Sequence, residues 1–497
     1  MTGQTADPPG ALPADHRRLL ALRLRGRAPR GPDSSSSASI AVTADRTQTS
    51  SAQQRVWLMH ELARDPAASN VSSLWHVSGG PLDITRLADA LAAVSRRHEI
   101  LRTRYREVEG EVRQSISGDE LPLGLVDLTG LAPSVAIERA AEAARHDTAQ
   151  AFDLARDPPV RFVAYQLRCG EHLLHACFHH IAVDGPSIAL FWRDLSAAYA
   201  ALSSGRPPPP PPAVQYVDYA GWQNRWLDGP EAAEQVTFWR MFLDGAPPYV
   251  AIVTDRDRPK VPGGEAGLAV VDVPDETLVR LRSLSQSAGT TQFMTLLAAF
   301  YAFLAWRTGQ TDLVVGSPSA GRARPEFDDV MGVFVNTIAL RLQWTGDPTF
   351  RQLLAKTRDM ALAAYQHQEL PFQRIVQAIR PRRRSGRNPI FNIWFDVVQQ
   401  QAQPDFAGMR VSEVPVRLRG PRVDLSVRLV ESGGRLSCSF AYTTDLWTAS
   451  TVDQIASRFV RLLEVIGQRP DEAITSITVL AESRPHHGRE EERHDPR

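Results

Sequence analysis

The sequence is poor in lysine and cysteine and has no net charge. Lysine occurs only at Lys260 and Lys356, and the 56 basic residues are balanced by 56 acidic ones. A neutral chain argues against nucleic acid or an anionic membrane surface as the main partner. No stretch is long and apolar enough to cross a bilayer, and the N-terminus has no signal-peptide pattern. These absences predict a cytoplasmic protein without membrane contact.

The sequence also gives little support for disulfide bonds, a zinc site or a hydrolase active site. Cys169, Cys177 and Cys438 are odd in number and widely spaced, so neither a disulfide framework nor a zinc ribbon is predicted. The nearest approach to a nucleophile elbow, Gly-Ser-Pro-Ser-Ala-Gly at 316–321, departs from the G-x-S-x-G spacing. A hydrolase triad is therefore not expected.

The overall composition is typical of a globular protein that is large enough for two hydrophobic cores. Of the 497 residues, 43% are hydrophobic and 23% charged. Residues 1–45 stand apart as a short Leu- and Arg-rich helix on a Ser-rich linker; a docking element and a solvated tail are both open interpretations. Residues 481–497 form a charged tail that we expect to be disordered.

Between these ends, helical and strand patterns mix without regular alternation, which predicts an α+β fold with mixed sheets. Helices are predicted at 52–62, 84–97, 135–151, 276–286, 291–307, 349–366 and 451–466. Strands are predicted at 73–77, 101–105, 112–116, 160–167, 173–180, 313–316, 338–342, 392–397, 424–429 and 436–442.

The clearest chemistry lies where the strand at 173–180 ends in His179 and His180 and continues to Asp184 and Gly185. Neighbouring strand residues point to opposite faces, so only one histidine can serve a given cavity and a shared metal ion is disfavoured. A histidine at the mouth of a strand can act as a general base, because its ordinary pKa lies near working pH. Two structural histidines remain the alternative.

The motif His-His-x-x-x-Asp-Gly at 179–185 resembles the signature of condensation domains of nonribosomal peptide synthetases. Further stretches resemble other motifs of that family, in the same order along the chain. They begin at Ser51, Arg97, Tyr216, Met331, His367 and Arg387. Departures are mild: Tyr105 stands where the family usually has Phe, and Glu369 where it has Asp.

The resemblance implies two chloramphenicol-acetyltransferase-like lobes in a V-shaped pseudo-dimer with a central tunnel. The lobes would span 46–228, with the histidine motif, and 229–480. No cofactor or metal would be bound; the donor would arrive as a thioester on the phosphopantetheine of a carrier protein. The acceptor would be a small molecule or a second carrier-bound group. Because no adenylation or carrier domain follows, we expect a free-standing enzyme that meets its carrier in trans.

The same resemblance assigns roles at the site. His180 would handle the proton, and His179 would be structural. Asp184 could orient His180 or pair with an arginine, and the family favours the pair, with Arg322 as first candidate. The Gly185 amide could face the developing oxyanion.

Two further residues, Arg341 and Asn336, are expected to support the site, with Arg341 the second candidate partner of Asp184. For carrier docking the densest basic cluster is Arg382, Arg383, Arg384 and Arg387, although an ordinary solvated loop is an equal alternative.

The predicted reaction is transfer of a carrier-bound acyl or aminoacyl group to an amine or hydroxyl. The run Gly-Val-Phe-Val-Asn-Thr at 332–337 is the condensation form and differs from epimerisation domains, and heterocyclisation domains lack the paired histidines. Two alternatives remain: a non-catalytic carrier-docking module of the same fold, and a related acyltransferase that uses CoA thioesters.

Overall fold

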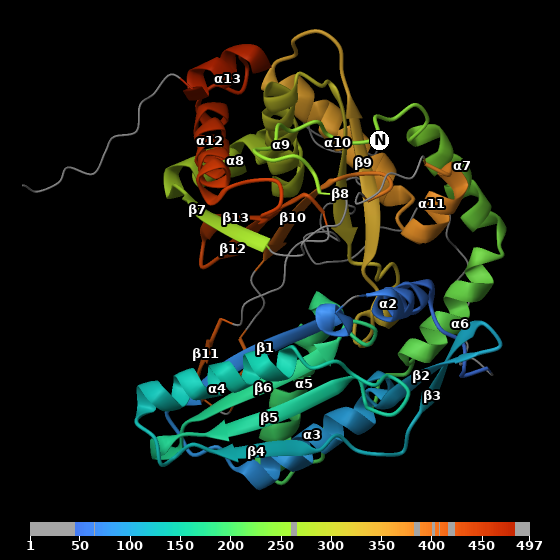
Figure 1. The fold of residues 1–497 in the computed structure, drawn as a ribbon, viewed down its shortest axis with the longest axis vertical. Coiled ribbons are helices and arrows are strands. Elements are labelled where there is room, and N and C mark those ends of the chain that lie inside the picture. The colour runs from blue at the N-terminus through green and yellow to red at the C-terminus, as the bar shows by residue number, and fades with distance from the viewer. Residues whose placement is uncertain are drawn as a thin grey trace, which may run out of the picture.

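The computed structural model describes residues 45–482, apart from 64, 260–265, 382–387, 400–402, 407 and 416–422. The chain forms two lobes, each built on one mixed β-sheet with helices packed against it (Figure 1). The predicted α+β class with two lobes is confirmed. The segments at 1–44 and 483–497, including the expected N-terminal helix and the charged tail, lie outside the described residues.

The first lobe holds a five-stranded sheet in the order β11-β1-β6-β5-β4. Its strands are β1 (Asn70–Ser78), β4 (Leu123–Asp127), β5 (Val160–Gln166), β6 (His172–His179) and β11 (Arg410–Glu413). Its helices are α2 (Ser51–Leu62), α3 (Ile84–Arg97), α4 (Pro133–Thr148), α5 (Gly185–Ser203) and α6 (Tyr216–Leu227). A separate hairpin joins β2 (Thr103–Val108) to β3 (Glu111–Ile116).

Alternation along β6 explains how this sheet is covered on both faces. Leu174 and Phe178 pack into a core shared with α3 and α5, whereas Leu173 packs with the small alanines of α4 on the opposite face. This is the two-residue period of a strand that is buried on both sides. His175 and His179 therefore lie on the α4 side of the sheet.

The second lobe holds a six-stranded sheet in the order β7-β13-β12-β10-β8-β9. Its strands are β7 (Ala266–Val273), β8 (Asp312–Ser319), β9 (Asn336–Gln343), β10 (Ile393–Gln399), β12 (Leu425–Ser432) and β13 (Arg435–Thr443). Its helices are α7 (Pro230–Phe242), α8 (Asp275–Ser287), α9 (Gln292–Thr308), α10 (Phe350–Gln366), α11 (Phe372–Ile379), α12 (Ala449–Gln468) and α13 (Ile474–Glu482).

Helix α9 is the central helix of this lobe and is apolar almost all round, as expected for a helix surrounded by other elements. The Thr291 side chain caps its first turn, and Gly309 ends it in the left-handed conformation at φ 70°. Among the described residues no single helix is long and apolar enough to cross a membrane; α8 and α9 meet such a criterion only together, and they are bent by 107°.

Two segments of the second half of the chain belong structurally to the first lobe. Strand β11 follows β10 in the sequence but pairs with β1 (Figure 1). Phe406, just before β11, is fully buried with its ring 5.8 Å from that of Tyr199. Phe327 and Phe334, between β8 and β9, are buried in the core formed by α3 and α5. The predicted boundary at residue 228 therefore stays a proposal.

Several expected elements differ in detail. The strand predicted at 101–105 begins instead as a 3₁₀ turn, Glu99–Arg102, before β2. The strand predicted at 313–316 is longer, and β8 continues to Ser319. Strands β4, β7 and β11 were not expected; β4 and β7 are edge strands with exposed apolar residues, and their sequences show no clean alternation of burial.

We expect Phe406→Ala to lower the free energy of unfolding by about 3–5 kcal/mol, because it empties a fully enclosed site in the core of the first lobe. Denaturant unfolding of the purified chain measures this loss. Met241→Ala, which truncates a side chain that is 75% exposed, serves as the control and should change stability by less than about 0.5 kcal/mol. An equal loss in both variants would mean that Phe406 does not anchor β11.

Candidate active site

The histidine pair lies at the junction of β6 and α5, in the first lobe. β6 ends at His179, and Asp184 is the N-cap of α5, its side chain accepting the backbone N–H of Ser187 at 2.9 Å. Pro186 lies in the first turn, where its missing N–H costs nothing. A buried strand and a capped helix thus hold the two ends of the loop that carries His180.

His180 is half-buried, and its hydrogen bonds fix the protonation pattern of its ring. Its backbone N–H donates to the Ser69 carbonyl at 2.8 Å, and its Nδ1 lies 2.6 Å from the Val183 carbonyl oxygen. A carbonyl oxygen can only accept, so Nδ1 carries the proton of the neutral ring and Nε2 carries the lone pair. This tautomer can accept a proton at Nε2.

His179 is buried and takes part in a chain of hydrogen bonds on the α4 side of the sheet. Its Nδ1 accepts the Ile181 N–H at 3.2 Å, which places the proton on Nε2. Nε2 lies 3.3 Å from Nδ1 of His60, and the two rings meet edge to face at 5.0 Å. Phe152 packs edge-on against the same ring. These contacts support a structural role for His179.

His60 was not among the predicted site residues. It lies in the last turn of α2, more than a hundred residues before His179. Only the packing of α2 against the end of β6 brings the two rings together, and no spacing in the sequence indicates that contact.

Asp184 is buried and surrounded by donors. Arg322 approaches it with both terminal nitrogens at 3.0 and 3.2 Å, and Ser187 donates its Oγ–H at 2.7 Å. The backbone N–H groups of Phe334 and Val335 donate at 3.0 and 3.2 Å. Burial alone would raise the pKa of Asp184, but the charge of Arg322 and these hydrogen bonds lower it below its usual range.

The ion pair with Arg322 is therefore present as expected, and the orienting role for Asp184 is not supported. Its oxygens bond Arg322, Ser187 and the 334–335 backbone, while Nδ1 of His180 bonds Val183 instead. The Arg322 guanidinium is 5% exposed, also donates to Ser187 Oγ at 2.9 Å and lies 4.3 Å over the Phe334 ring. Asp184 thus joins the loop of His180 to a segment of the second half of the chain.

The structure corrects the prediction of Arg341 as the second candidate partner of Asp184. Arg341 lies on β9 and makes a two-pronged bond to Asp312 of β8, at 2.9 and 2.8 Å. Strand pairing between β8 and β9 brings these two residues together, so Arg341 supports the second lobe and does not contact Asp184.

Asn336 lies at the start of β9 and anchors the loop after α10. Its amide nitrogen donates to the carbonyls of Gln368 and Leu370, both at 2.8 Å, and its oxygen accepts the Phe372 N–H at 3.1 Å. It follows directly on the 334–335 segment that binds Asp184. Its expected supporting role stays a proposal.

The predicted roles of Gly185 and of the arginine cluster are not tested by contacts in the structure. Gly185 is the first residue of α5, so it directly follows Asp184 at the helix N-terminus. The arginine cluster Arg382, Arg383, Arg384 and Arg387 lies outside the described residues. Both the oxyanion role of Gly185 and the docking role of the cluster stay predictions.

A polar cluster extends along the α4 side of β6 behind the histidine pair. His175 is fully buried 3.6 Å from Asp147, which also binds Arg161 at 2.7 Å. Burial lowers the pKa of His175 to about 4, with Asp147 opposing the shift and Arg161 adding to it. Burial likewise raises the pKa of the Cys177 thiol to about 12, so this thiol is not a nucleophile at neutral pH.

The fold and this site define a condensation domain, and the chain belongs to that family. The model of the condensation domain family matches residues 43–485. Among curated relatives, one of the linear gramicidin synthase proteins of Brevibacillus parabrevis is 38% identical over 87% of this chain and 8% of its own length. Phosphinothricin tripeptide synthetase PhsC of Streptomyces viridochromogenes is 34% identical over 97% of this chain and 44% of its own length. The chain thus spans less than half of these relatives.

Solved structures agree on the fold. The X-domain from teicoplanin biosynthesis is 29% identical with a TM-score of 0.77, covering 88% of this chain and 99% of that one, and an X-domain complex with OxyB is similar. The first condensation domain of the calcium-dependent antibiotic synthetase, 21% identical, has a TM-score of 0.72 and covers 86% of this chain and 98% of that one. The predicted family is therefore confirmed.

We expect Asp184→Asn to lower the free energy of unfolding by about 3–5 kcal/mol, because it leaves the Arg322 guanidinium buried without its counter-charge. Thermal and denaturant unfolding measure the loss. Asp312→Asn, which removes the charge opposite Arg341 at a more exposed position, should cost clearly less. An Asp184→Asn chain with wild-type stability would reject the structural role of the pair.

Buried His175 should make stability depend on pH. The unfolded chain takes up this proton near pH 6.5 and the folded chain only near pH 4, so the stabilisation present above pH 6.5 is lost as pH falls to about 4. The loss amounts to roughly 3 kcal/mol. Denaturant unfolding at several pH values should show this slope in wild type and a clearly smaller one in His175→Asn, where buried His98 and His172 still contribute. The control His146→Asn, on α4, should retain the slope; a wild-type slope in His175→Asn would assign it to other groups.

Proposed function

We propose that this chain catalyses the transfer of an acyl or aminoacyl group from the phosphopantetheine thioester of a carrier protein to an amine or hydroxyl. The carbonyl carbon forms a bond to the acceptor nitrogen or oxygen, and its bond to sulfur breaks. The acceptor loses one proton and the departing thiolate gains one. The product is an amide or an ester, in line with the condensation domain family to which the chain belongs.

One observation carries this proposal: the tautomer of His180. With its proton on Nδ1, bonded to Val183, the ring has its lone pair on Nε2 and can take the acceptor's proton as the bond forms. Asp184, held by Arg322 and the 334–335 backbone, fixes the position of the loop and leaves the proton transfer to His180. A thioester is already activated, so positioning and one proton transfer suffice.

The remaining parts of the proposal rest on the family. Carrier proteins would present the donor, and the cluster at 382–387 is our candidate for docking them. The chain itself would bind no cofactor, since the phosphopantetheine belongs to the carrier. A CoA thioester as donor is the alternative within the same chemistry, and a carrier-bound and a CoA-bound donor can be compared directly in one assay.

A second candidate function is a protein-recruiting domain without its own turnover. The observation that favours it is the likeness to the X-domain, for which a complex with another protein, OxyB, has been solved. The intact pair His179 and His180 favours the enzymatic function.

We expect His180→Ala to fold normally and to lower turnover with an alcohol acceptor by about 10²–10⁴-fold, because an alcohol needs a base as it attacks. The loss with an amine acceptor should be smaller, since an amine is already nucleophilic. Product is measured by mass spectrometry after incubation with a loaded carrier protein. His146→Ala is the control and should match wild type. Wild-type rates in His180→Ala with both acceptors would remove it as the base; carrier binding without turnover would favour the recruiting domain.

A further inference from the structure

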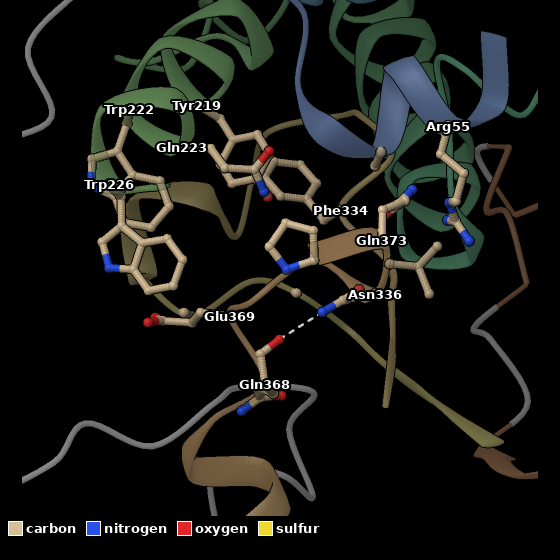
Figure 2. Close-up of a pocket in the computed structure, with 15 residues that line it drawn as sticks. Arg55, Tyr219, Trp222, Gln223, Trp226, Phe334, Asn336, Gln368, Glu369 and Gln373 are labelled. Carbon is tan, nitrogen blue, oxygen red and sulfur yellow. Dashed lines mark hydrogen bonds between the residues drawn. The ribbon is translucent and has the colours of Figure 1, made fainter. Parts of the chain in front are cut away.

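A pocket that does not contain the histidines of the motif lies between the two lobes, next to the 334–335 segment that binds Asp184. We call it the tryptophan pocket: it is lined by Trp222 and Trp226 of α6, Glu369 and Pro371 of the loop after α10, and Arg55 of α2 (Figure 2). Its empty space is about 510 Å³, open mouth included. Because that figure includes open solvent, the pocket is an open groove with aromatic and charged walls.

Glu369 is the charged group at one end of this pocket. Its nearest hydrogen-bond donor is the amide nitrogen of Gln235, at a long 3.5 Å, and the described part of the chain gives it no ion pair. Burial raises the pKa of this carboxyl group, and the hydrogen bond from Gln235 and the charge of nearby Arg324 only partly oppose the shift. Glu369 is only partly buried, but a carboxylate there without an ion pair is destabilised, and a bound cation would stabilise it.

The two tryptophans add a surface that favours cations. Their rings are stacked at 6.3 Å with an angle of 24°, and Figure 2 shows Trp226 beside Glu369. The faces of tryptophan rings attract ammonium groups and also bury attached carbons. Arg324 lies 6.0 Å over the Trp222 ring and bonds Glu326 at 3.4 Å.

Of the two arginines near the pocket, Arg324 lies over the Trp222 ring, whereas Arg55 lies away from this end. Figure 2 places Arg55 on the opposite side of the pocket from Trp226 and Glu369. The half of the pocket around Glu369 thus combines one carboxylate with aromatic walls. That combination selects organic cations over neutral or anionic groups.

We propose that the tryptophan pocket binds an alkylammonium group, whose charge Glu369 neutralises and whose carbons contact Trp222 and Trp226. This site is separate from His180 and its proton transfer, and it does not depend on the proposed acyl transfer. Its walls come from α2 and α6 on one side and from the loop after α10 on the other. A bound cation would consequently connect the lobes.

The test titrates n-butylammonium into the full chain and follows binding by calorimetry and tryptophan fluorescence. The control ligand is 1-pentanol, of similar size and without charge. We expect saturable binding of butylammonium and at least tenfold weaker binding of pentanol. Glu369→Gln should weaken butylammonium binding at least tenfold, and Trp222→Ala several-fold. Glu234→Gln, on the exposed face of α7, is the matched control and should bind like wild type.

Two results would overturn the proposal: no saturable binding to wild type, or equal affinity for pentanol and butylammonium. If Glu369→Gln is unstable, the pH dependence of wild type replaces it. Binding needs the ionised carboxylate, so affinity should fall as pH decreases through the raised pKa of Glu369, which Arg324 and Glu231 also influence. Affinity that stays constant through the acid range would reject Glu369 as the counter-charge.

Discussion

The arrangement of the site depends on one buried carboxylate. Asp184 accepts hydrogen bonds from Arg322, Ser187 and the backbone of Phe334 and Val335, and these donors come from both halves of the chain. Each bond constrains the short loop between β6 and α5. Because an isolated buried charge is so unfavourable, the loop and the 322–335 segment must assemble together, and the position of His180 follows from that assembly.

Much of the fold could be predicted from local patterns. The helix at 84–97 was predicted at its observed bounds because its apolar face repeats at helical spacing, and the strand of the histidine motif is a continuous apolar run. The motif also predicted that His179 packs away from the site, and His179 is buried. These features are local, since each depends on residues within a few positions of one another.

The rest of the site depends on contacts between distant segments, and such contacts cannot be recognised in a single sequence. Arg322 lies just after β8 and Arg341 lies within β9, and only the pairing of β8 with β9 assigns Arg341 to Asp312. His60 meets His179 through helix packing alone. The short strand β11 has four residues with little apolar character, so its place beside β1 is set by the sheet edge it completes.

The exchange of segments between the lobes limits how such domains can be recombined. A chimera that joins the first part of this chain, through α6, to the later part of a relative would receive a foreign β11 at the edge of its own sheet. It would also receive foreign residues at Phe327 and Phe334 inside its own core. A junction placed after α6 therefore divides the hydrophobic core of the first lobe between two proteins. Successful junctions must transfer these two segments together with the lobe they complete.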